Sequence, residues 1–338
     1  MIAVYLKPKS GYRTPLRSDT LWGIICWGIR NLYGEAELVQ FIESYSSNPP
    51  LFISSAFPFL GDLQDGQLKV EEHFFPKPFL PPISAIEGKE LEDYQRIKDF
   101  KKIKYLSLAD FQAVLNGTLN NDDIFERIKK GQNTIVPPKR ELYSVTHNRI
   151  DRLKGYTLEV KGQGQLFHTD EYHFTDKKEA GLFFLAKGEV EKWLYPVLRY
   201  YSHIGMGGDY SIGKGVFDIY WKDVVIQETE QADALINLSL YYPKIEEELP
   251  LFNKNKNFRY LLERRSGRVG QHRVYREKES LYFFREGSIF PTTQTSRSNW
   301  GSVFVDEEIK KEEEETKILG HPIYRYGMGF MLKMKIKS

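Results

Sequence analysis

The chain has 338 residues, of which 41% are hydrophobic and 28% are charged. These fractions are near the globular average and exclude a largely disordered chain, and the length favours two domains, because a single hydrophobic core usually stops growing before this size. The net charge is only +2, so whole-chain charge argues neither for nor against a nucleic-acid partner, and only local clusters can decide.

The start of the chain, MIAVYLKPKSGYR, lacks the basic segment and apolar core of a secretory signal. No later segment approaches the ~18 uncharged apolar residues of a membrane span. We therefore expect a soluble, cytoplasmic protein. Cys26 is the only cysteine and lies in an apolar helical pattern, which indicates a small buried hydrophobe and excludes a disulfide framework.

The first three predicted elements are a strand, a helix and a strand. Apolar runs predict strands over residues 2–7 and 51–57. Between them, apolar residues recur at helical spacing from 19 to 33, and Ser18 and Asp19 supply side chains of the type that caps a helix N-terminus. We expect this helix to be the most clearly encoded element of the N-terminal part.

The middle of the chain changes character. Residues 58–140 contain proline-rich stretches around a helical pattern, and we interpret them as an insertion. Residues 141–175 contain short β-like runs separated by glycines, which predict hairpins. A strand over 181–186 and an amphipathic helix over 190–201 follow, and Pro196 should kink this helix or mark a late start.

A glycine-rich loop and the strand VFDIYW complete the order β-α-β, insertion, β-α-β over residues 1–222. This is the split βαβ order of a ferredoxin-like sheet. The last 110 residues or so are strand-rich, and we expect a second domain over residues 230–338. The predicted fold class is α+β, with two ferredoxin-like (RRM-like) domains and insertions.

The loop GMGGDYSIGKG at 205–215 is the most informative segment. It is not a Walker A motif, because Gly215 occupies the position where a Ser or Thr hydroxyl must bind Mg²⁺. The loop also leads from a helix into a strand, whereas Walker A and dinucleotide-binding loops lead from a strand into a helix, so both motifs are excluded. Bared amides and Lys214 could instead lie along a phosphodiester backbone. The alternative is a simple connection between two elements.

Two basic clusters point to RNA. The stretch 256–278 holds eight Lys and Arg residues against two Glu residues, with Tyr and His interleaved, which suits single-stranded RNA or, alternatively, a solvated hairpin. Residues 146–155 add Arg149 and Arg152 near His147. The acidic run 306–315 is interpreted as a solvated loop or disordered insertion, with docking on a basic partner as the other interpretation.

Little in the sequence indicates catalysis. His147 could act as a general base for RNA cleavage, but no acid partner can be identified. The seven histidines are scattered without metal-ligand spacing, so no metal site is expected, and no cofactor is implied.

Three segments together resemble the RAMP superfamily of CRISPR effector proteins: residues 11–35 (GYRTPLRSDTLWGIICWGIRNLYGE), 148–155 (NRIDRLKG) and the loop 205–215. Within it, the opening pattern and YRYGMGF at 324–330 resemble the family of the fourth Csm subunit of type III-A complexes. The resemblance does not cover the expected insertion, the basic stretch 256–278 or the acidic run.

The resemblance implies a non-catalytic subunit of an antiviral ribonucleoprotein that binds the 5′ handle of the guide RNA (crRNA). It implies two protein partners, the large polymerase-type subunit and the RAMP backbone subunit, and a thumb-like hairpin on the guide path. The RNA-binding residues expected by position are Arg13, His147, Arg149, Arg152, Gly205, Gly207, Gly208, Gly213, Lys214, Gly215, Arg325 and Tyr326.

Two other functions stay open at this point. One is a metal-independent endoribonuclease that matures precursor guide RNA through His147. The other is a structural adaptor whose exposed aromatic residues hold protein partners and barely touch RNA.

Overall fold

The computed structural model describes the chain with several gaps. The described residues are 1–64, 67–83, 91–132, 136–151, 153–160, 163–175, 179–252, 255, 257–268, 277–292, 299–307, 309 and 321–337. Among these residues, no helix combines the length and the apolar character that a membrane span requires.

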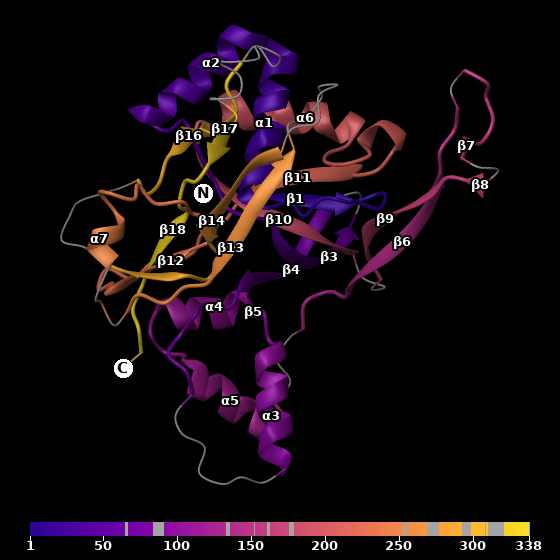
Figure 1. The fold of residues 1–338 in the computed structure, drawn as a ribbon. Helices are drawn as coiled ribbons and strands as arrows, with labels where there is room; N and C mark the ends of the chain where they lie inside the picture. Colours follow the sequence, from indigo (N-terminus) through magenta and orange to yellow (C-terminus); the bar gives the residue numbers. More distant parts are fainter. Residues whose placement is uncertain are drawn as a thin grey trace.

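A seven-stranded antiparallel sheet organises the molecule (Figure 1). Its order is β11-β1-β10-β3-β4-β5, and β2 also pairs with β10. The register between the two central strands runs from Ile2 opposite Ala186 to Leu6 opposite Leu182. The strands are β1 (Ile2–Pro8), β2 (Leu51–Ile53), β3 (Phe57–Gln64), β4 (Gln67–Pro76), β5 (Tyr105–Ser107), β10 (Glu179–Gly188) and β11 (Phe217–Asp223).

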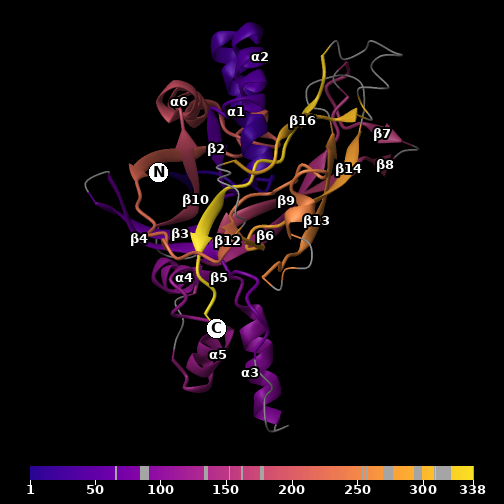
Figure 2. The same cartoon turned by 90° about the vertical axis from the view of Figure 1, so that its left-hand side faces the viewer.

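One face of the sheet is covered by helices (Figure 2). They are α1 (Ser18–Tyr33), α2 (Glu35–Glu43), the 3₁₀ turn η1 (Ser44–Ser46), the π-helical turn η2 (Val190–Leu194) and α6 (Tyr195–Ile204). Pro196 lies in the first turn of α6, so of the two predicted effects, a kink or a late start, the structure has the late start. Gly28 of α1 allows close packing, because a Cβ there would lie 2.5 Å from a methyl carbon of Val197.

The N-cap role predicted for Ser18 and Asp19 is wrong. The N-cap residue of α1 is Arg17, and its side chain makes no capping hydrogen bond. The Ser18 hydroxyl is buried and accepts a hydrogen bond from the Leu240 amide at 2.9 Å, while Asp19 forms an ion pair with Arg265 at 2.8 Å. Tertiary contacts therefore use the side chains that the local pattern assigns to the helix end.

The other face of the sheet packs on α4 (Leu108–Leu115) and on a three-stranded sheet of β15 (Ile289–Pro291), β12 (Ala234–Asn237) and β18 (Met331–Met334). Ala3, Tyr5, Phe183 and Leu185 point to this side, while their neighbours in β1 and β10 point to the helices. Because both faces are buried, these strands are continuous apolar runs. The segments predicted as two domains thus share one core cluster.

Residues 58–76, assigned to an insertion by the sequence, supply β3 and β4 of the main sheet. Further along the same segment, α3 (Leu91–Lys102) and α5 (Asn121–Lys129) project away from the sheet beyond α4 (Figures 1 and 2). The start of α5 carries a reciprocal capping box between Asn120 and Asp123.

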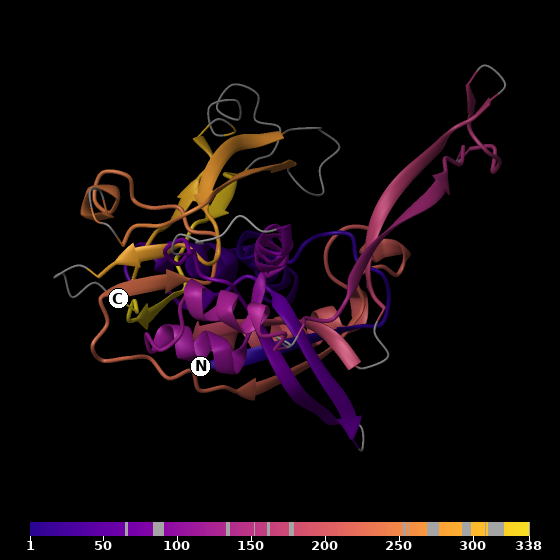
Figure 3. The same cartoon turned by 90° about the horizontal axis from the view of Figure 1, so that it is seen from below.

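The predicted hairpin is confirmed as a long arm. It consists of β6 (Arg140–Asn148) and β9 (Leu166–Phe174), with β7 (Glu159–Val160) and β8 (Gln163–Gly164) toward its tip. Figure 3 shows the arm leaving the body of the molecule. We call β6 to β9 the hairpin arm.

The C-terminal part is strand-rich, as predicted. Beside the three-stranded sheet it contains α7 (Leu249–Phe252) and two hairpins, formed by β13 (Leu262–Arg268) with β14 (Glu277–Phe284) and by β16 (Val303–Val305) with β17 (Tyr324–Tyr326). The 3₁₀ turn η3 (Tyr210–Ile212) precedes this part and lies between α6 and β11. The mixed α and β content and antiparallel sheets agree with the predicted class. The division into two ferredoxin-like domains stays a prediction.

Candidate nucleic-acid interface

The glycine-rich loop 205–215 connects α6 to β11, and its glycines serve different needs. Gly205 and Gly215 have φ of +84° and +67°, and a Cβ at Gly205 would lie 2.8 Å from the Lys214 carbonyl oxygen, while one at Gly215 would overlap that of Met206. The path of the loop itself therefore requires glycine at both positions. Gly213 also has φ of +84°, but its missing Cβ faces open space.

Most of the amides expected to be bare are bonded to protein. The Met206 amide donates to the Gly215 carbonyl at 2.7 Å, the Gly208 amide donates to Thr14 Oγ1 at 3.0 Å, and the Gly215 amide donates to the Gly11 carbonyl at 2.9 Å. The Gly207 amide has no acceptor among the described residues. The loop thus presents its backbone to solvent over a shorter stretch than the sequence predicts.

The two predicted cations beside this loop both have acidic partners. Arg13 Nη1 lies 2.7 Å from Asp209 Oδ2, and Lys214 Nζ lies 2.9 Å from Glu171 Oε2. The side chains of Arg13 and Lys214 are 37% and 27% exposed, so both cations still reach the surface. Each has donors left for a second anion, because a guanidinium has five and an ammonium has three.

The first loop of the chain joins the glycine-rich loop to the hairpin arm. Tyr12 and Tyr172 exchange backbone hydrogen bonds of 3.3 and 2.8 Å. The Arg140 guanidinium lies over the Tyr172 ring at 4.7 Å and donates to the Tyr12 hydroxyl at 3.4 Å. We call residues 9–14, the loop 205–215 and the base of the hairpin arm the loop–hairpin junction.

The hairpin arm carries exposed apolar and aromatic side chains. They are Leu142, Tyr143, Ile150, Leu153, Tyr156, Leu166 and Phe167. Exposed rings of this kind suit stacking with unpaired bases. Arg149 is exposed on the same arm, while Arg152 lies outside the described residues.

His147 lies on the arm among neutral partners. Its ring stacks on Phe167 with centroids 5.0 Å apart, and Nε2 lies 2.7 Å from Thr169 Oγ1. A hydroxyl and a phenyl ring supply no second acid or base for cleavage. In the described part of the chain, no group of three His, Cys, Asp or Glu side chains could hold a metal ion.

Arg325 and Tyr326 lie in the interior. Arg325 is 7% exposed, pairs with Asp306 at 2.9 Å and also donates to the Arg265 carbonyl. Tyr326 is 2% exposed, and its hydroxyl accepts from the Ile53 amide at 3.1 Å. These contacts give both residues a structural role within the fold.

Part of the basic stretch 256–278 is neutralised within the fold. Arg265 pairs with Asp19, and Glu263 of β13 accepts from Arg17 Nη1 at 2.7 Å. Arg264 is exposed and donates to the hydroxyl of Ser280 on β14. Residues 269–276, which include Arg273 and Arg276, lie outside the described residues.

Sequence reasoning missed the residues that organise the junction. Tyr12, Thr14, Glu171 and Asp209 all contact predicted site residues or the segments beside them. Glu171 lies 43 positions from Lys214. No local pattern marks such pairs, because the fold alone brings them together.

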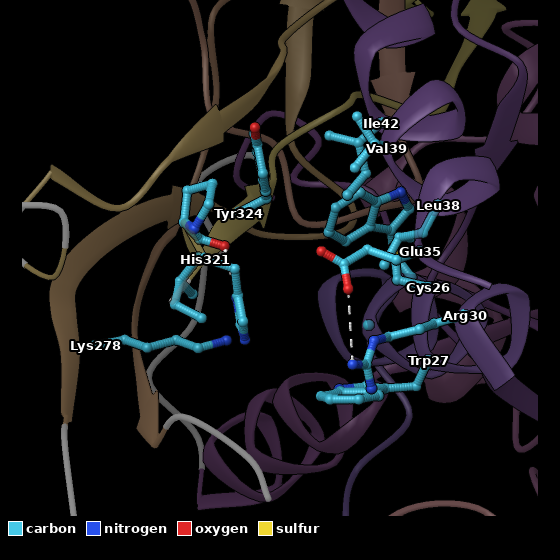
Figure 4. A pocket seen from close by; sticks show the side chains of 14 residues that line it. Cys26, Trp27, Arg30, Glu35, Leu38, Val39, Ile42, Lys278, His321 and Tyr324 are labelled. Atoms are coloured by element: carbon cyan, nitrogen blue, oxygen red, sulfur yellow. Dashed lines mark hydrogen bonds and ion pairs between the residues drawn. The ribbon is translucent and has the colours of Figure 1, made fainter. Parts of the chain in front are cut away.

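A cavity of about 310 Å³ lies between α1 and α2 on one side and Lys278 of β14 with residues 321–324 on the other (Figure 4). Its apolar walls include Trp22, Cys26 and Trp27, and Lys278 reaches toward it from β14. Burial raises the pKa of the Cys26 thiol well above its ordinary value. The expectation of a buried, hydrophobe-like cysteine is confirmed.

Comparisons with known proteins agree on one family. The model of the RAMP superfamily matches residues 7–218, and the model described as the CRISPR Csm4 C-terminal domain matches residues 230–334. A protein of Thermococcus onnurineus (strain NA1), named CRISPR system Cms protein Csm4, is 25% identical over 343 residues, which cover 99% of this chain and 97% of that one.

Solved structures share the fold. A crystal structure of a Csm1-Csm4 cassette in complex with cA4 matches with a TM-score of 0.59 and 21% identity, over 100% of this chain and 98% of that chain. A Csm3-Csm4 subcomplex in the type III-A CRISPR-Cas interference complex matches with a TM-score of 0.56 and 16% identity, over 99% and 100% of the chains.

Proposed function

The chain belongs to the RAMP superfamily, and from this membership we propose that it is a non-catalytic, cytoplasmic subunit of a type III-A CRISPR effector ribonucleoprotein that binds the 5′ handle of the guide RNA. One observation carries the proposal: the loop–hairpin junction joins a glycine-rich loop and two partly exposed cations to an arm that carries exposed rings.

These parts match the chemistry of single-stranded RNA. Lys214 and Arg13 bind phosphates, and exposed rings of the hairpin arm stack on splayed bases. The open side of Gly213 lets the RNA strand approach the protein backbone. Arg149 adds a cation on the arm, and Arg152 belongs to the same proposed set. His147 contributes its ring to the stacking surface and performs no proton transfer.

The partners proposed for this subunit are those named for the similar structures. One contains Csm1 with Csm4, and another contains Csm3 with Csm4. We propose that this chain likewise joins the large polymerase-type subunit to the RAMP backbone subunit. We also propose that residues 1–222 and 230–338 are its two RRM-like domains; the strand order β11-β1-β10-β3 supports this for the first.

Lys214→Met tests the RNA contact. Labelled handle RNA is titrated with the full chain at several salt concentrations, and the variant should bind more weakly, with a salt slope lower by about 0.7 because one single-strand phosphate contact is lost. Lys102→Met on α3 is the matched control, since Lys102 is an exposed lysine whose ion pair is with Asp99. Equal affinity and slope for the Lys214 variant and the wild type would refute the proposed contact.

The endoribonuclease alternative has a separate test. Repeat-containing RNA is incubated with the purified chain in EDTA, and the products are separated on a denaturing gel. We expect intact RNA, because the contacts of the His147 ring within the described residues are a hydrogen bond with Thr169 and stacking on Phe167, and neither side chain is an acid or a base. Cleavage that disappears in His147→Ala would establish the nuclease instead.

A further inference from the structure

A buried carboxylate lies beneath the glycine-rich loop at the base of the hairpin arm. Glu171 of β9 has a side chain only 1% exposed, and its Oε2 lies 2.9 Å from Lys214 Nζ and 3.3 Å from His173 Nε2. Oε1 has no hydrogen-bond partner among the described residues. Burying a charge with an unsatisfied oxygen costs free energy, so this position calls for a compensating role.

Three chain segments meet at this carboxylate. A Cβ at Gly11 would overlap Glu171 Oε2 and lie 2.5 Å from His173 Nε2, so the first loop passes directly over both side chains. The carbonyl of Gly11 accepts from the Gly215 amide at 2.9 Å. Glu171 therefore contacts the hairpin arm, the first loop and the glycine-rich loop at once.

The electrostatics keep Glu171 charged. Burial opposes its ionisation, but the hydrogen bonds from Lys214 and His173 and the charge of Lys214 outweigh burial and lower the pKa of the carboxyl. The Lys214 ammonium donates one of its three N–H groups to Glu171, and the Lys214 side chain is 27% exposed. Within the described residues Glu171 is the hydrogen-bond partner of the ammonium, so its remaining donors can bind a phosphate at the surface.

We propose that Glu171 is a positioning residue, which holds the Lys214 ammonium at the surface of the glycine-rich loop and ties this loop to the hairpin arm. RNA then meets both elements in one fixed arrangement, with phosphate bound by a lysine that a buried carboxylate orients. The inference rests on the proposed RNA-binding function and deepens it.

RNA titrations separate positioning from simple charge. Glu171→Gln should bind handle RNA about five- to tenfold more weakly, which corresponds to the net contribution of one ordinary hydrogen bond. Its affinity for scrambled RNA of equal length and its salt slope should stay unchanged. Lys214→Met should lose affinity for both RNAs and lower the slope. The double variant should bind no more weakly than Lys214→Met, because Glu171 acts through Lys214.

Two results would overturn the proposal. One is that Glu171→Gln discriminates between handle RNA and scrambled RNA as strongly as the wild type does. The other is a double variant whose loss equals the product of the single losses, which would show that the two side chains act independently.

Hydrogen exchange tests the mechanical link without RNA. In Glu171→Gln, the amides of 205–215 and of 166–174 should lose protection together. Asp209→Asn removes the ion pair between Asp209 of the glycine-rich loop and Arg13 of the first loop. It should lower the protection of the amides of 205–215 and leave that of 166–174 unchanged. If Glu171→Gln does not fold, Lys214→Met breaks the same link from the loop side. Unchanged protection of 166–174 refutes the link, even if the wild type binds no handle RNA and the proposed function itself fails.

Discussion

Glu286 offers a direct test of how the N- and C-terminal parts are held together. Its carboxylate is 6% exposed and accepts from Arg17 Nε at 2.6 Å, from Arg17 Nη2 and from the Ser55 hydroxyl. Arg17 and Glu286 are 269 positions apart in the chain. Glu286→Gln keeps the shape of the side chain but replaces the bidentate ion pair with a single neutral acceptor.

The expected loss of stability follows from the burial of the pair. Removing one partner of a buried ion pair costs about 3–5 kcal/mol, because the other charge is left uncompensated. Arg17 is 18% exposed and keeps Glu263 at 2.7 Å, which reduces the penalty. We therefore expect Glu286→Gln to lower the free energy of unfolding by about 2–3 kcal/mol, which corresponds to several degrees in Tm.

Urea unfolding measures this loss. Asp99→Asn is the control, because its pair with Lys102 is exposed on α3 and should contribute little to stability. Arg17→Met combined with Glu286→Leu should regain much of the lost stability, since apolar pairs often replace buried ion pairs without cost. The reasoning is refuted if Glu286→Gln unfolds at the same urea concentration as Asp99→Asn.

Three further outcomes concern single side chains. In Gly215→Ala the added Cβ would overlap the Met206 carbonyl, so the free energy of unfolding measured in urea should fall by at least about 3 kcal/mol. In Gly213→Ala the added Cβ meets open space, and the loss should be about 1 kcal/mol. Burial lowers the pKa of His73 to about 4 from 6.5, so on acidification the unfolded chain takes up this proton before the folded chain does. The free energy of unfolding should therefore fall by up to about 3 kcal/mol between pH 6.5 and pH 4. His73→Gln should reduce this pH dependence. Cys26 should react with thiol reagents at least about tenfold faster in urea than in the native chain, and equal rates would contradict its burial.

Elements with a local signature could be predicted from the sequence. The period of α1 and the apolar run of β10 are properties of neighbouring residues, and both elements form where expected. β3 was hidden by Pro58, which usually argues against a central strand. The structure accommodates Pro58 because it lies opposite Leu182 of β10, while the pairing of β3 with β4 begins only at Phe59.

The candidate site divides in the same way. The glycine-rich loop is visible in the sequence because its glycines are adjacent, but the acids that pair with its cations come from distant segments. Arg13 and Asp209 are 196 positions apart. Arg325 and Tyr326 belong to a motif near the C-terminus, and both are buried in the structure. The motif alone could not show whether these residues bind RNA or pack in the interior.

The shared core also constrains the order of events during synthesis. One face of β1 and β10 is covered by Ile236 of β12 and by Leu332 and Met334 of β18. Until residue 334 has left the ribosome, α4 can cover only part of this face, and the aromatic and aliphatic side chains that β12 and β18 cover in the complete fold stay exposed. Such surfaces recruit chaperones or lead to aggregation, so a nascent chain of this protein should depend on protection until translation is nearly complete.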